Sequence, residues 1–207
     1  RQNKRMALTN WGLWLRPRAK KVLLDVQQIE SGFAEQEILA GSIQTSVSQT
    51  AAEHLLPMVI RNIDGNFPAM RINMEVLNTE QVIESVRNFE CELGVIEGRC
   101  DDERIHQELW CHDHLAIVAS ASHPFAKFQH VSFAQLERAK WILREQGSGI
   151  RAIFESALHG YIDDINVWRE YEQVNVILKL VRDSNYLTCL PFLDVKEDIE
   201  DGKLVEL

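Results

Sequence analysis

The sequence predicts an α/β protein in which two lobes follow one another along the chain with a cleft between them, preceded by a long helix. Strand-like and helix-like segments alternate twice, first over residues 41–112 and again over residues 113–207. Before them, the apolar residues from Leu15 to Phe33 recur in steps of four and three, the spacing of an amphipathic helix. Hydrophobic residues make up 45% of the 207 and charged residues 26%, as in ordinary globular proteins.

The long helix comes first. Thr9 can cap a helix that begins at Asn10, and Pro17 lies near its start, where it would kink the helix without ending the pattern. We expect the apolar stripe of this helix to form a dimerisation seam. The stripe consists of Leu15, Ala19, Val22, Val26, Ile29 and Phe33. The alternative is a helix whose apolar stripe lies on its own domain.

The charge of the chain is unevenly distributed. The total is −9, but residues 1–21 carry +7 and the remainder −16. Such asymmetry suggests a basic element that meets phosphate, joined to an acidic body that does not. A basic tail that is merely solvated is the alternative.

The first lobe is predicted to have the order βαβαβ, which implies a mostly parallel sheet. Strands alternate apolar and polar residues, and helices place apolar residues three and four apart. The expected strands are 42–47, 70–77 and 93–96, the last closed by Gly98, and the expected helices are 51–63 and the segment after the cap Asn78-Thr79 up to Phe89.

The second lobe repeats the alternation less regularly. Gly147-Ser148-Gly149 opens one of its helices, and Pro191 stops one of its strands. The expected strands are 115–119, 141–143, 165–169, 187–190 and 204–207, and the expected helices are 133–137, 150–159 and 174–181.

Small polar residues stand where strands give way to helices in both lobes. The first turn of a helix has unpaired N–H groups and a partial positive charge, and ligands of α/β sheets sit at such positions. We therefore expect a site for a small polar or anionic metabolite, although each segment alone is more often a helix cap. The expected effector-binding residues are Ser48, Gln49, Thr50, Asn78, Thr79, Gly98, Ser148 and Arg151.

The charges of Arg151 and Glu97 bear on which kind of ligand the site would bind. Arg151 lies near a helix start, where its positive charge is unfavourable for the helix dipole. An anionic ligand would offset this charge; the alternative is an ion pair with Glu155. Glu97 would repel an anion, so a neutral polar ligand or a zwitterion stays open.

The order and spacing of several short motifs resemble those of the LysR-type transcriptional regulators, from the end of the DNA-binding domain into the effector-binding domain. Two departures are Glu92 in place of the usual Asp, and Ser184-Asn185-Tyr186 in place of a Gly-x-Gly turn. The motifs are Leu8-Thr9-Asn10-Trp11-Gly12, Ser48 with Thr50, Leu55-Leu56-Pro57, Phe67-Pro68, Asn78-Thr79, Glu92-Leu93-Gly94-Val95-Ile96, His123-Pro124, Gly147-Ser148-Gly149 with Arg151, Leu190-Pro191 and Gly202-Lys203-Leu204.

The resemblance implies two Rossmann-like lobes of periplasmic-binding-protein type, in a bacterial homodimer or tetramer that binds promoter DNA and changes geometry when an effector enters the cleft. It divides the chain into a winged helix-turn-helix remnant (1–12), a linker helix (13–40), lobe I (41–112) and lobe II (113–207), and the segment that returns to lobe I in the family is expected to be absent. The remnant would contact phosphates or the minor groove through Arg1, Asn3, Lys4 and Arg5.

Three other classes of function are alternatives to this one. Gly-x-Gly-x-x-Gly, phosphate-loop and nucleophile-elbow motifs are missing, so we expect neither an enzyme nor a cofactor. A transport solute-binding protein has two such lobes but needs no basic segment or heptad stripe. A metal or redox sensor could use Cys111-His112-Asp113-His114, or Cys91, Cys100 and Cys111, but a polar strand before Leu115 is the preferred reading and no metal is expected.

The number of cysteines and the length of the apolar runs indicate the cellular compartment. Four cysteines are too few for a disulfide scaffold, and no apolar run approaches the roughly 18 residues of a membrane span. The expectation is therefore a cytoplasmic protein.

Overall fold

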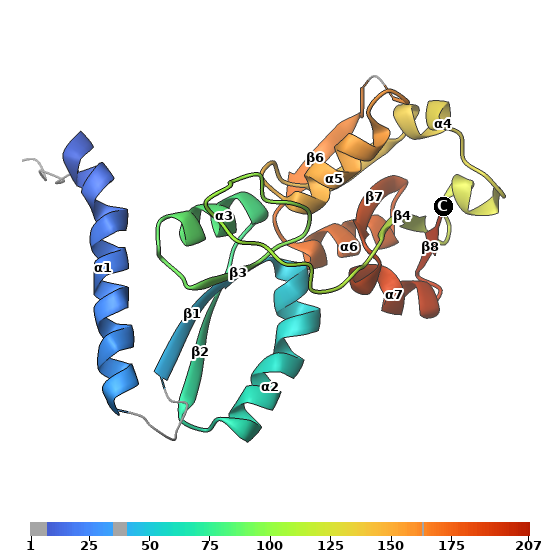
Figure 1. The fold of residues 1–207 in the computed structure, drawn as a ribbon. Helices are drawn as coiled ribbons and strands as arrows, with labels where there is room; N and C mark the ends of the chain where they lie inside the picture. Colours follow the sequence, from blue (N-terminus) through green and yellow to red (C-terminus); the bar gives the residue numbers. More distant parts are fainter. Residues whose placement is uncertain (1–7, 35–40, 163) are drawn as a thin grey trace, which may run out of the picture.

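The structure is a computed structural model that describes residues 8–34, 41–162 and 164–207. Helix α1 (Asn10–Ala34) stands apart from the two lobes, beside lobe I (Figure 1). It runs through Pro17, and the Thr9 hydroxyl accepts a hydrogen bond from the Gly12 N–H at 3.2 Å, so the expected cap forms. Arg16 and Lys20 connect α1 to Glu90 at 2.6 and 3.4 Å. Within the described ranges, no helix has the length and apolar character needed to cross a membrane.

Lobe I contains a three-stranded parallel sheet in the order β2-β1-β3. This agrees with the predicted βαβαβ order. The strands are β1 (Gly41–Val47), β2 (Met70–Val76) and β3 (Leu93–Val95), and the main helices are α2 (Leu56–Asn66) and α3 (Thr79–Arg87). Its small core contains Val47, Ala51, Ala52 and Leu56.

The first helix of lobe I is not the single helix predicted over 51–63. It begins as a π-helix, η1 (Ala51–Leu55), and only then becomes α2. The N–H of Leu56 donates to the carbonyl of Ala51, five residues back. Pro57 has no N–H and so cannot donate the α-helical hydrogen bond to the residue four positions earlier. The regular α-helix therefore begins anew at Leu56, with Pro57 in its first turn.

Lobe II contains a five-stranded mixed sheet in the order β6-β5-β7-β4-β8, with β4 antiparallel to β7 and β8. Apolar clusters pack against its strands: one includes α6 and α7, the other α4 and α5. The strands are β4 (Leu115–Ser120), β5 (Lys140–Arg144), β6 (Val167–Tyr171), β7 (Tyr186–Pro191) and β8 (Leu204–Glu206). The helices are η2 (Pro124–Lys127, 3₁₀), α4 (Phe133–Arg138), α5 (Gly149–Leu158), α6 (Val174–Arg182) and α7 (Phe192–Glu200).

Lobe II differs from the prediction in three places. Helices η2 and α7 were not predicted, although Phe192, Val195 and Ile199 have helical spacing and pack into the core. Pro191 ends β7 as expected, but it also precedes a helix, a position that proline tolerates. The polar strand expected before Leu115 is wrong, because residues 111–114 are irregular.

Candidate effector site

The helix starts of the two lobes meet directly. The N–H of Glu80, in the first turn of α3, donates to the Gly147 carbonyl at 3.1 Å. At Gly149 a Cβ would lie 2.3 Å from the Glu97 carbonyl oxygen and 2.6 Å from Thr79 Oγ1. The start of α5 therefore reaches lobe I this closely only because residue 149 has no side chain.

Ser48 lies at the carboxyl end of β1, as predicted, and is buried. Its hydroxyl donates to Glu97 Oε1 at 2.7 Å. Burial raises the pKa of Glu97, while the Ser48 hydrogen bond and the nearby Arg144 lower it in part. A carboxylate thus lies at the junction, the region where the two lobes meet, and the sequence alone predicts for it only a repulsion of anions.

Gln49 and Thr50 bind lobe II. The Gln49 Oε1 atom accepts from the Val174 N–H at the start of α6, at 3.2 Å. The Thr50 hydroxyl donates to Asp194 Oδ2 on α7, at 2.9 Å, and makes no cap hydrogen bond. Sequence reasoning missed Asp194 because α7 itself was not predicted.

Two of the predicted residues are helix caps. Asn78 forms a capping box with Gln81 at the start of α3. The Ser148 hydroxyl accepts from the Arg151 N–H at 3.5 Å and so caps α5. The capping account, weighed as an alternative above, describes both side chains in this structure.

Arg151 makes its contacts within lobe II. Its side chain is 5% exposed and pairs with Glu155 at 2.5 Å and with Glu170 at 3.1 Å. Its Nη1 also donates to the Arg144 carbonyl at 2.9 Å. The ion pair with Glu155 that was the alternative reading is therefore present, and the guanidinium is held inside its own lobe.

A groove of about 970 Å³ opens along this junction, between α3 and α5. Thr79, Gly98 and Ser148 line it, together with Glu97. The residue Thr79 is 8% exposed, and its hydroxyl is one of two buried side-chain oxygens without a hydrogen-bond partner among the described residues. The charged residues around the groove are Glu80, Glu84, Glu97, Asp101, Glu155, Arg87 and Arg99.

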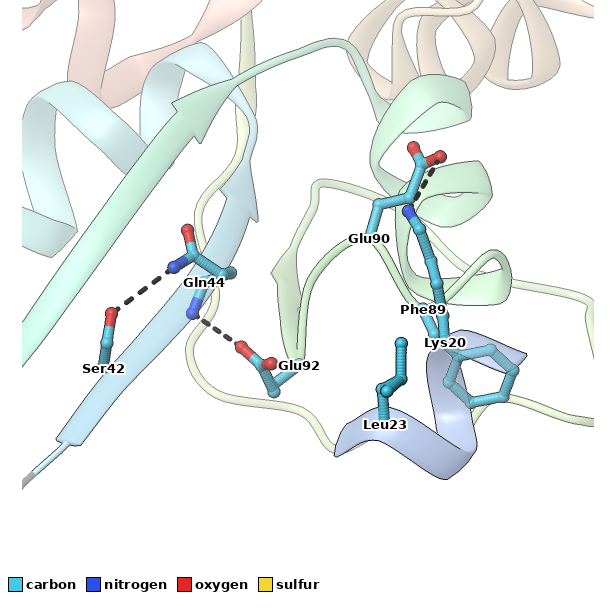
Figure 2. Close-up of a pocket in the computed structure, with 7 residues that line it drawn as sticks. All are labelled: Lys20, Leu23, Ser42, Gln44, Phe89, Glu90 and Glu92. Atoms are coloured by element: carbon cyan, nitrogen blue, oxygen red, sulfur yellow. Dashed lines mark hydrogen bonds and ion pairs between the residues drawn. The ribbon is translucent and has the colours of Figure 1, made fainter. Parts of the chain in front are cut away.

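A second hollow of about 390 Å³ lies between α1 and lobe I. Figure 2 shows the Lys20 side chain of α1 extending towards Glu90, while Gln44 lies on β1 next to Glu92. None of the predicted effector-binding residues lines this hollow. The junction groove is therefore the better candidate for the effector.

Several other predicted residues lie elsewhere. Cys91, Cys100 and Cys189 are buried, and Cys111 is exposed. The predicted DNA contacts Arg1, Asn3, Lys4 and Arg5 fall outside the described residues, as does the side chain of Phe33.

Two α/β lobes whose polar helix starts enclose a groove define a ligand-binding domain of the effector-binding kind. Residues 36–207 match the family described as LysR substrate binding domain. The chain belongs to the LysR family of transcriptional regulators.

Relatives and solved structures agree with this assignment. The HTH-type transcriptional regulator YeiE of Escherichia coli (strain K12) is 31% identical over 207 residues, which cover all of this chain and 69% of that protein. CysL of Bacillus subtilis (strain 168) is 28% identical over 76% of this chain and 53% of its own length. The regulatory domain of Synechocystis PCC6803 CcmR in complex with 2-PG has the same fold (TM-score 0.73, 21% identity), covering 81% of this chain and 80% of that one. The effector-binding domain of QuiR in complex with shikimate gives a TM-score of 0.69 at 16% identity, with coverage of 81% and 80%.

Proposed function

We propose that a small polar effector binds in the junction groove and changes how a dimer of this regulator engages promoter DNA. The observation that carries the proposal is the buried, unpartnered Thr79 hydroxyl in the groove wall. An unpaired buried hydroxyl costs free energy, and a ligand that hydrogen-bonds to it recovers that cost. The CcmR and QuiR domains, which share the fold, were solved with small molecules bound.

The charges of the groove favour particular ligands. Five carboxylates and two guanidinium groups line it, so acidic groups are in excess. Glu97, in the wall of the groove, accepts a hydrogen bond from Ser48. We infer that the effector presents hydrogen-bond donors, such as hydroxyl or ammonium groups, beside any acidic group it carries.

The coupling to DNA follows from the two-lobe arrangement. A ligand held by Thr79 on one lobe and by the start of α5 on the other stabilises one lobe arrangement over others. Only that difference in affinity can shift the attached DNA-binding segments. This role needs no catalytic step, in keeping with relatives that are named as transcriptional regulators.

A thermal-shift screen of small polar metabolites against the purified chain tests the proposal. A true effector raises the melting temperature in proportion to the logarithm of its concentration above Kd. Thr79→Val should weaken its binding, whereas Thr188→Val should not. Thr188 is a matched control because its hydroxyl is also buried and unpartnered, but it lies on β7 outside the groove. Equal effects of both substitutions would contradict this site.

A further inference from the structure

A second polar cluster joins the lobes through η1 and α7. We propose that Glu53, His54 and Asp194 bind one divalent transition-metal ion, which ties lobe I to lobe II. Each of these residues offers one ligand atom, and the three atoms lie within 4.8 Å of one another. Metal bonds of about 2.0–2.2 Å place ligand atoms about 3–4 Å apart, so small side-chain adjustments complete the site.

Neighbouring side chains hold both carboxylate oxygens of Asp194 in place. The His54 Nε2 atom lies 2.8 Å from Asp194 Oδ1. The other carboxylate oxygen, Oδ2, accepts a hydrogen bond from Thr50 at 2.9 Å. Such support from a neighbouring residue orients metal ligands and is typical of protein metal sites.

The electrostatics of the cluster favour a cation. The Asp194 side chain is only 1% exposed, yet it faces a second carboxylate, that of Glu53. His54 supplies at most one positive charge, and only when protonated. A divalent ion would neutralise both carboxylates while the imidazole stays neutral.

The donor set indicates the class of metal. One imidazole nitrogen and two carboxylate oxygens suit zinc and the neighbouring first-row ions, whereas magnesium and calcium prefer oxygen alone. Water can complete the coordination, because Glu53 and His54 are exposed on the outer side. The two residues stand on η1, and π-helical turns inside helices are frequent at functional sites.

The ion would act as a second signal, at a site separate from the junction groove. The ligands of the ion come from both lobes, so the ion binds tightly only when η1 and α7 are in contact, as they are in this structure. By linkage, the metal stabilises that arrangement.

Zinc titration of the purified, chelator-treated chain tests the proposal by isothermal titration calorimetry. We expect one site per chain, and a loss of affinity of at least about tenfold in His54→Gln and in Glu53→Gln, since even supporting residues of metal sites contribute that much. Both side chains are exposed, so these variants should fold. Asp194→Asn should show the same loss.

The control is the double variant His112→Gln/His114→Gln, which removes the other histidine pair. It should bind zinc like the parent chain. Cobalt then reports on the ligands, because a thiolate such as that of Cys111 adds a charge-transfer band that a nitrogen and oxygen set lacks. Zinc binding that survives His54→Gln and Glu53→Gln, or that disappears in the control, would overturn the assignment; the three residues would then form only a hydrogen-bonded link between the lobes.

Discussion

Residues at similar positions in the sequence make different contacts at the junction between the lobes. Thr50 and Thr79 both lie at helix starts, yet Thr50 binds Asp194 across the junction and Thr79 is left without a partner. The difference comes from what each hydroxyl faces in the other lobe. A helix-start hydroxyl is therefore evidence for a site only when its surroundings are known.

Glu97 permits a prediction about pH. Burial raises its pKa above the ordinary value of 4.5, so the folded state binds the proton more tightly than the unfolded chain does. The charged form therefore costs stability at neutral pH, and this cost disappears as the pH falls below 4.5. Glu97→Gln should raise the melting temperature by a few degrees at pH 7, with a smaller gain near pH 4.

Differential scanning calorimetry at several pH values measures this effect. Glu206→Gln is the control, because Glu206 is an exposed glutamate on β8. A gain for Glu97→Gln that stays constant from pH 7 to pH 4 would show that the carboxylate is not destabilised by burial.

Among the described helices and strands, α1 carries the largest number of exposed large apolar side chains. Leu15, Val22, Val26 and Ile29 of the heptad stripe are 44–60% exposed in the single chain. Such a surface is typical of an interaction site. The dimerisation seam stays a prediction, and a second copy of the chain is the partner that its heptad spacing fits.

Substitution on α1 tests this seam. Val26→Asp would place an unpaired charge in the seam, at a cost of typically about 3 kcal/mol or more, and should shift the chain from dimer to monomer. Light scattering at micromolar concentration measures the mass. Lys21→Asp makes a matched control, since Lys21 lies off the heptad stripe on the same helix. A parent chain that is already monomeric would contradict the seam.

The approach of α5 to lobe I gives a second prediction for an element. In Gly149→Ala the new methyl group would clash with the Glu97 carbonyl and with Thr79. The lobes should therefore separate, which small-angle scattering would detect as a larger radius of gyration. Gly65→Ala has open space around it on α2 and should leave the radius unchanged. An unchanged radius in Gly149→Ala would mean that the close contact does not hold the lobes together.

At the scale of the whole molecule, the charge is unevenly distributed between a basic N-terminal segment and an acidic remainder. The charge of +7 over residues 1–21 against −16 elsewhere predicts that phosphate contacts form at one end of the chain. A full-length regulator in which Arg1, Lys4 and Arg5 are replaced by Ala should bind specific and random DNA more weakly to a similar extent. Each lost phosphate contact should flatten the slope of log K against log salt by about 1. Fluorescence anisotropy at several salt concentrations measures this slope, and an unchanged slope would exclude these contacts.

Much of this protein could be predicted from local pattern. The periods of apolar residues and the Gly and Pro turns predicted both α/β lobes, the parallel sheet of lobe I and the helix α1 with its Thr9 cap. These signals are carried by neighbours in the sequence, so no tertiary contact is needed to interpret them.

The junction between the lobes was decided by tertiary structure. Thr50 and Asp194 are 144 positions apart, and nothing in either local pattern says that they meet. The ion pair of Arg151 with Glu155 follows from their spacing of four residues, but its pair with Glu170, 19 positions away on β6, forms only because the fold brings the two together. Residues far apart in the chain form one site only when packing brings them to one surface, and both the junction groove and the proposed metal site arise in this way.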